Sequence, residues 1–206
     1  MAMRKTWFMC GSALLLFAGC VGVERSYPDK RYFVLAAAEK GSAANPSVNA
    51  RKGVLLVANL RVSPRYEGKS FVYRRSESNF EVDFYNQFLV SPGAILTEEV
   101  RKGLARAEVF QTVIGGGSQL ESTHVLEGSV NALHGDFRDA GSPKAVLEVE
   151  FFLTRDSAMK ADIVTQRRYL KTVPVNGRSP EALVQGWNRA LEEILATLVA
   201  DLNSTN

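Results

Sequence analysis

Cysteine and histidine are scarce in this chain of 206 residues, which contains only Cys10, Cys20, His124 and His134. Two cysteines cannot build a disulfide framework, and a zinc site needs four ligands placed close together. On one continuous strand, the two histidines would share a face but lie about 33 Å apart, so they could not bind one metal ion. The sequence therefore predicts no metal centre, and we expect no cofactor apart from a covalent lipid.

Clustered positive charge and long apolar runs are also missing. The 25 Lys and Arg residues are nearly balanced by 22 Asp and Glu residues, and no basic run provides the footprint that nucleic acids require. The apolar stretch from Trp7 to Phe17 is shorter than the roughly 20 residues that span a bilayer. These absences argue against a nucleic-acid partner and against a membrane span at this stretch.

Common enzyme signatures are absent as well. No serine lies in a G-x-S-x-G pattern, although a catalytic triad assembled in space stays open. Gly68-Lys69-Ser70 resembles the end of a phosphate-binding loop, but Ser63 stands where that motif needs its first glycine. We therefore predict that the protein is not an enzyme.

The first twenty residues have the parts of a bacterial export signal. Two basic residues precede the apolar stretch, and two small residues stand directly before Cys20. A cysteine at this position is typical of lipoprotein signals, so we predict that residues 1–19 are removed and that Cys20 is lipidated, for example with palmitate. Phe17 stands where such signals usually carry leucine. The alternative is an ordinary secretory signal, with Cys20 left free or paired between chains.

Lipidation at Cys20 predicts a periplasmic protein that is anchored to a membrane without spanning it, because each buried methylene stabilises attachment by about 0.8 kcal/mol. Aspartate after the cysteine commonly retains lipoproteins at the inner membrane, so Val21 favours the outer membrane over the inner one. Residues 20–30 are polar and read as a tether. Residues 31–206 then form a single domain, large enough to bury a core.

The domain shows both strand and helix patterns. We expect a loop at residues 38–52 and a hairpin from residues 71–74 and 80–85. The alternation in 144–154 predicts a strand with one polar face. The full set of expected strands comprises residues 31–37, 54–62, 71–74, 80–85, 109–114, 126–132, 144–154 and 162–173.

Two amphipathic helices are predicted, each entered through a serine and a proline. Ser91 and Ser179 offer an N-cap hydroxyl, and proline is favoured at the first helical position. The first helix has an apolar stripe through residues 95–104, and the second runs for about 22 residues to Asp201. The resulting fold class is α+β: a single domain whose mixed or antiparallel β-sheet is packed by two main amphipathic helices.

Aromatic and arginine residues concentrate in residues 66–88. A core takes some of them, but tyrosine and arginine are also enriched at the energetic centres of protein interfaces. Those left outside the core are the candidates for partner contact. The candidate interface residues are Tyr66, Tyr73, Arg74, Arg75, Tyr85 and Phe88.

The segment from Arg61 to Pro92 combines a buried strand, an arginine, a Tyr-Arg hairpin, a Phe-Tyr-rich strand and a helix started by proline. This order resembles the ABC-type transport auxiliary lipoproteins, which include the paraquat-inducible type that accompanies mammalian-cell-entry (MCE) lipid-transfer assemblies. Tyr32-Phe33-Val34-Leu35, the helix at 94–104 followed by Val109-Phe110, and the C-terminal helix extend the resemblance over nearly all of the mature chain.

The resemblance implies a lipid-tethered periplasmic domain that docks on, or forms a collar for, a lipid-transport machine. Its implied partners are MCE or permease subunits, and a homo-oligomeric ring is a further implied form. Three alternatives stay open. They are an outer-membrane assembly or cell-wall-synthase activator lipoprotein, a periplasmic hydrolase with a buried polar cluster around His124 or His134, and a direct lipid carrier.

Overall fold

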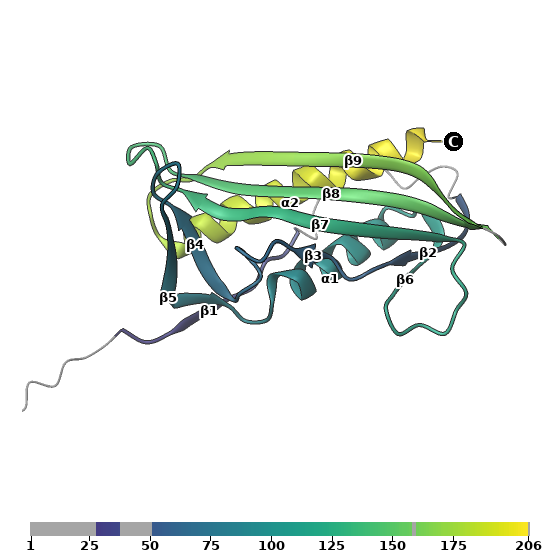
Figure 1. Ribbon diagram of the computed structural model, residues 1–206, viewed down its shortest axis with the longest axis horizontal. Coiled ribbons are helices and arrows are strands. Elements are labelled where there is room, and N and C mark those ends of the chain that lie inside the picture. The colour runs from purple at the N-terminus through teal and green to yellow at the C-terminus, as the bar shows by residue number, and fades with distance from the viewer. Residues whose placement is uncertain (1–27, 38–50, 158–159, 206) are drawn as a thin grey trace, which may run out of the picture.

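Figure 1 shows the computed structural model, which describes residues 28–37, 51–157 and 160–205. The described residues form one mixed nine-stranded sheet and two helices, which confirms the α+β prediction. The predicted signal and Cys20 lie outside the described residues. The strands are β1 (Arg31–Phe33), β2 (Arg51–Val57), β3 (Arg61–Val62), β4 (Ser70–Arg74), β5 (Phe80–Phe88), β6 (Phe110–Gly115), β7 (His124–Asp136), β8 (Lys144–Ser157) and β9 (Lys160–Pro174), and the helices are α1 (Pro92–Arg106) and α2 (Pro180–Ser204).

The long strand β7 organises the sheet. Along one edge it pairs with antiparallel β8, which pairs in turn with antiparallel β9. Along its other edge it pairs in succession with the short parallel strands β2, β3 and β4. β6 extends the sheet beyond β2, whereas β5 and then β1 extend it beyond β4. These two extensions lie toward opposite ends of the molecule (Figure 1).

Both helices cover the same face of the sheet and enclose the core. α2 lies along β8 and β9, and α1 packs on β6 and on α2. Trp187 of α2 is fully buried, and its ring stands perpendicular to that of Phe71 at 5.0 Å between centroids. Gly186 permits this close packing, because a Cβ there would lie only 2.6 Å from the Cβ of Ala145. The opposite face, which neither helix covers, is called the open face below.

Both predicted helices are confirmed, together with the residues at which they begin and their apolar stripes. Both helices begin at the proline, but only the Ser179 hydroxyl accepts a capping hydrogen bond, from the Ala182 N–H at 3.2 Å; Ser91 makes no such bond. α2 runs three residues beyond the predicted end at Asp201. Neither described helix is long and apolar enough to cross a bilayer.

Several predicted strand boundaries are wrong, including the following three. β1 ends at Phe33, because the next backbone segment bonds to the helices: the Ala37 N–H donates to Glu99 Oε2 at 2.9 Å. The single strand expected over residues 54–62 is broken, since the Leu60 N–H donates to Thr97 Oγ1 of α1 at 2.9 Å. Residues 51 and 52, expected in a loop, open β2, and the rest of that loop lies outside the described residues.

The two histidines do not share a face of β7, contrary to the prediction. The strand has a bulge between Val130 and Ala132, which shifts the side-chain alternation by one residue. His124 therefore lies on the helix-covered side, with its ring 5.0 Å from that of Phe110, whereas His134 lies on the open face. The bulge also moves Ala132 to the open face, away from the side predicted for it.

Candidate functional site

The structure divides the six candidate interface residues into two groups. Three expose 9% of their surface or less, namely Tyr66, Tyr73 and Phe88. Three keep accessible surface, namely Arg74, Arg75 and Tyr85. Only the second group can offer its side chains to a partner, so the prediction for the first group is wrong.

Each buried candidate contacts a part of the chain that is distant in sequence. The Phe88 ring lies 5.5 Å from that of Trp187 in the core. Tyr73 packs edge-on against Phe137 at 5.4 Å, and its hydroxyl donates to Asp83 Oδ2 at 2.5 Å. Burial and this hydrogen bond raise the pKa of Tyr73 well above its ordinary value. The side chain of Tyr73 is therefore a neutral structural group.

Several apolar side chains near β1 and β5 are exposed instead. Their exposed fractions range from 44% to 65%. β1 pairs with the second half of β5, and the Leu89 N–H donates to the Phe33 carbonyl oxygen at 2.9 Å, which keeps the group in one region. This group, called the β5 surface, consists of Tyr32, Val34, Val82, Phe84, Leu89 and Val90.

The sequence contained one signal for the β5 surface. Asp83 interrupts an aromatic strand, and its Oδ1 accepts hydrogen bonds from the backbone N–H groups of Tyr85 and Asn86 at 2.8 and 2.9 Å. An aspartate that bonds to the backbone two and three residues ahead bends the chain locally. The bend interrupts the simple alternation of β5 and leaves Phe84 exposed beside Lys30, whose Nζ lies 4.4 Å from the ring centroid.

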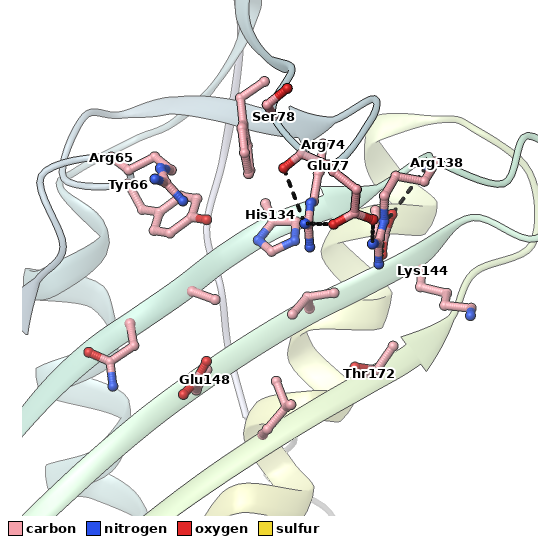
Figure 2. A pocket seen from close by; sticks show the side chains of 16 residues that line it. Arg65, Tyr66, Arg74, Glu77, Ser78, His134, Arg138, Lys144, Glu148 and Thr172 are labelled. Carbon is pink, nitrogen blue, oxygen red and sulfur yellow. Dashed lines mark hydrogen bonds and ion pairs between the residues drawn. The ribbon is translucent and has the colours of Figure 1, made fainter.

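A second feature is a hollow of about 800 Å³ on the open face, called the open-face hollow (Figure 2). The β3–β4 loop and the β4–β5 hairpin form its walls, and β7, β8 and β9 form its floor. The floor includes the apolar side chains of Ala132, Val146 and Leu170. Its volume is in the range of sites for small molecules.

His134 of β7 lines this hollow and is 5% exposed. Its ring is nearly parallel to that of Tyr66 at 5.6 Å and edge-on to that of Phe80 at 5.9 Å. The Nδ1 atom is buried and has no hydrogen-bond partner among the residues that the structure describes. Burial lowers the pKa of His134 to about 4, so the imidazole is neutral at pH 7.

Charged side chains surround the hollow. Arg138 bonds to Asp136, with Nη2 2.7 Å from Oδ2, and also contacts Glu77. The hydrogen bonds from Arg138 lower the pKa of Asp136 to about 2 and raise that of Arg138. Arg74 Nη2 lies 2.7 Å from Glu77 Oε2.

The remaining charges of the hollow are distributed unevenly. Glu148 is paired with Arg168 of β9. Arg65 and Lys144 have no carboxylate partner within the described residues, so two cationic groups of the hollow are not neutralised by a direct ion pair. In Figure 2, Arg65 and Lys144 lie on opposite sides of His134.

The described residues do not form a recognisable metal or hydrolytic site. They contain no group of three or more side chains able to hold a metal ion. Thr123 Oγ1 lies 2.9 Å from His124 Nδ1, and Arg155 Nε lies 3.4 Å from its Nε2. Within this part of the chain, neither histidine bonds to a serine or a carboxylate, as a catalytic triad requires.

The chain matches a known protein family over most of its length. Residues 33–199 match the family model for the ABC-type transport auxiliary lipoprotein component. No curated protein matches the chain in sequence.

Solved structures share the fold. A DUF330 protein from Xanthomonas campestris has a TM-score of 0.68 and 17% identity, covering 86% of this chain and 95% of its own. An uncharacterised protein has a TM-score of 0.64 and 14% identity over 84% of this chain and 99% of its own. A hypothetical protein from Chlamydia trachomatis has a TM-score of 0.50 and 13% identity over 74% of this chain and 98% of its own. At these identities the likeness shows the fold alone.

Proposed function

Because the chain belongs to the family of ABC-type transport auxiliary lipoprotein components, we propose that it is a non-enzymatic docking or collar subunit of an MCE-type lipid-transport system. The match over residues 33–199 carries this proposal, since it includes almost every described element. We further propose that Cys20 bears the lipid anchor and that the protein faces the periplasm from the outer membrane.

The β5 surface is the best candidate for the docking contact. It combines exposed aromatic and aliphatic side chains, and Arg75 and Tyr85 lie in the same hairpin region. Soluble proteins seldom expose such groups together without a binding role. Aromatic and arginine side chains supply most of the binding energy at typical interfaces.

The position of this surface in the chain supports the same role. β1 contributes Tyr32 and follows the proposed tether directly. A tether of residues 20–30 reaches at most about 40 Å when fully extended. An anchor at Cys20 therefore keeps the β5 surface close to the membrane, where this surface can contact the subunits of a transport system.

The anchor is tested by replacing Cys20 with Ala in the full chain. We expect the variant to move to the soluble periplasmic fraction with its fold intact, because only the lipid attachment point is lost. Labelled palmitate should be incorporated into the native protein and not into the variant. Unchanged membrane fractionation of Cys20→Ala would contradict the anchoring role.

The docking role is tested by crosslinking in cells with the native anchor in place. We expect the native protein to capture MCE or permease subunits, and Phe84→Asp to reduce that capture at least fivefold. Leu120→Asp is the matched control, because Leu120 is also exposed, at 59%, but precedes β7 at the other end of the molecule. Capture of cell-wall synthases or outer-membrane assembly factors would favour the alternative lipoprotein function.

A further inference from the structure

We propose that the open-face hollow is a binding site for a phosphate monoester, held by Arg65 and Arg74 beside His134. This inference does not depend on the docking role. It rests on the arrangement of charge, on an unpartnered buried nitrogen and on the apolar floor.

Two guanidinium groups approach the same aromatic ring. The Cζ atom of Arg65 lies 4.8 Å from the ring centroid of Phe80, and that of Arg74 lies 5.7 Å from the same centroid. Glu77 neutralises Arg74 in part, whereas Arg65 has no carboxylate partner among the described residues. The two Cζ atoms are therefore no more than 10.5 Å apart, and an anion that enters between the two guanidinium groups is attracted by both. Planar guanidinium groups also match the geometry of phosphate oxygens.

The imidazole of His134 supplies the second observation. Its side chain is buried and lines the hollow, and within the described part of the chain its Nδ1 has no hydrogen-bond partner. A buried polar atom without a partner is rare in folded proteins and costs stability. Figure 2 shows the imidazole between Tyr66 and Arg74. Because Nδ1 exposes almost no surface, a ligand oxygen becomes its partner only when the side chains around the imidazole move apart on binding.

The carboxylates of the hollow do not cancel this site. Asp136 and Glu77 are both bonded to Arg138, and Glu148 is paired with Arg168 on the floor. The lining residues alone comprise four cations and three carboxylates. The excess positive charge therefore remains available on the Arg65 side and at Lys144.

The number of donors favours phosphate over carboxylate. A phosphate monoester offers three terminal oxygens, which suit two guanidinium groups and one imidazole, whereas a carboxylate offers only two. The apolar floor of Ala132, Val146 and Leu170 can accept a hydrocarbon portion of the same ligand. The phosphate can be carried by a lipid headgroup or by a soluble ester, and these two sources share the recognition chemistry.

The test is calorimetric titration of the full-length lipidated protein in non-ionic detergent. The probes are inorganic phosphate, dihexanoyl phosphatidic acid below its micelle concentration, and dihexanoyl phosphatidylcholine as a diester control. We expect saturable binding of phosphatidic acid, at least tenfold weaker in Arg65→Gln. The matched control is Arg189→Gln, because Arg189 is exposed on α2 and lies away from the hollow. We expect this control to bind like the native protein.

Each outcome bears on the proposal. If phosphatidic acid binds and inorganic phosphate does not, the site is supported and its phosphate is carried by a lipid headgroup. If the two probes bind equally, the site is supported and its phosphate can come from a soluble ester. Absence of binding by both probes, or equal weakening in Arg65→Gln and Arg189→Gln, overturns it, as does preference for phosphatidylcholine. Phe84→Asp should retain ligand binding, so failure of the docking proposal and failure of this one are distinguishable.

Discussion

Strand β8 presents both faces of the sheet within a single element. Its helix-facing side chains are at most 2% exposed and belong to the core: Ala145, Leu147, Val149, Phe151 and Leu153. Its other side chains face the open face and include Glu148, Glu150 and Phe152, all of them only partly buried. The same strand therefore stabilises the fold on one side and offers charge to solvent on the other.

This difference separates stability from binding. Burial of apolar side chains against the helices supplies a large favourable contribution to folding. Ion pairs on an exposed surface typically contribute 0 to about 1 kcal/mol each. Changes on the open face and at the β5 surface should therefore alter binding while leaving the domain folded, whereas changes on the helix side should unfold it.

Phe151 and Phe152 provide the strongest test of this separation, because they are adjacent in sequence and lie on opposite faces. Phe151 is 2% exposed and packs 6.2 Å from the Tyr169 ring. Phe151→Ala should lower the free energy of unfolding by about 3–5 kcal/mol, since it leaves a cavity in the core. Phe152→Ala should lower it by about 1 kcal/mol, mainly through weaker strand packing.

Urea unfolding of the two variants, followed by the fluorescence of Trp187, measures both effects. Comparable losses in the two variants would show that the open face is packed against something in the folded protein and would remove the distinction between the faces.

Elements with a single strong periodicity could be predicted from the sequence. The alternation of β8 and the apolar stripes of α1 and α2 were correct, because each element buries one face and the pattern repeats many times. The bulge in β7 could not be predicted. Val130-Asn131-Ala132 fits an uninterrupted strand, and only the pairing with β8 introduces the extra residue.

The candidate sites depend even more on distant contacts. Phe88 and Tyr66 are of residue types that are common at interfaces, but in the fold they pack against Trp187 and His134. No local sequence pattern indicates those contacts. The open-face hollow combines the β3–β4 loop, the β4–β5 hairpin and three long strands. The sequence identified the hairpin as important and missed His134 as its neighbour, because the predicted register placed that histidine on the wrong face.

The pH dependence of stability should report on the open face. The pKa of His134 is about 4 in the folded protein, below its ordinary value of 6.5. Burial lowers this pKa most, and the positive charges of Arg74, Arg138 and Arg65 lower it further, whereas the carboxylate of Asp136 raises it. Between these pH values the unfolded chain binds a proton that the folded protein does not. Stability should therefore fall as the pH drops from 6.5 to 4, by roughly 3 kcal/mol at about 1.4 kcal/mol per pKa unit.

Urea titrations at pH 7, 5.5 and 4 measure this slope. His134→Gln should reduce it, and the residual slope should come from His124, whose pKa burial also lowers, and near pH 4 from Glu98 and Asp83, whose pKa values also lie below their ordinary values. Asp136 does not contribute in this window, because its pKa falls from 3.8 to about 2 and its stabilisation is lost only at lower pH. An unchanged slope in His134→Gln would mean that the buried imidazole does not remain neutral.

The neighbouring residues Tyr169 and Arg168 should give the smallest losses of stability, and they also compare the two faces of the sheet. The Tyr169 hydroxyl donates to Asp201 Oδ2 of α2 at 2.7 Å, so it joins β9 to the helix layer, whereas Arg168 pairs with Glu148 on the open face. Tyr169→Phe should cost about 1 kcal/mol, because a hydrogen bond to a carboxylate is lost in a partly buried setting. Arg168→Gln should cost about 0.3 kcal/mol, since its side chain is 66% exposed and the pair is screened by solvent. High salt should erase the second loss and preserve the first, whereas salt sensitivity of both would indicate that the Tyr169 bond is as exposed as the open-face pair.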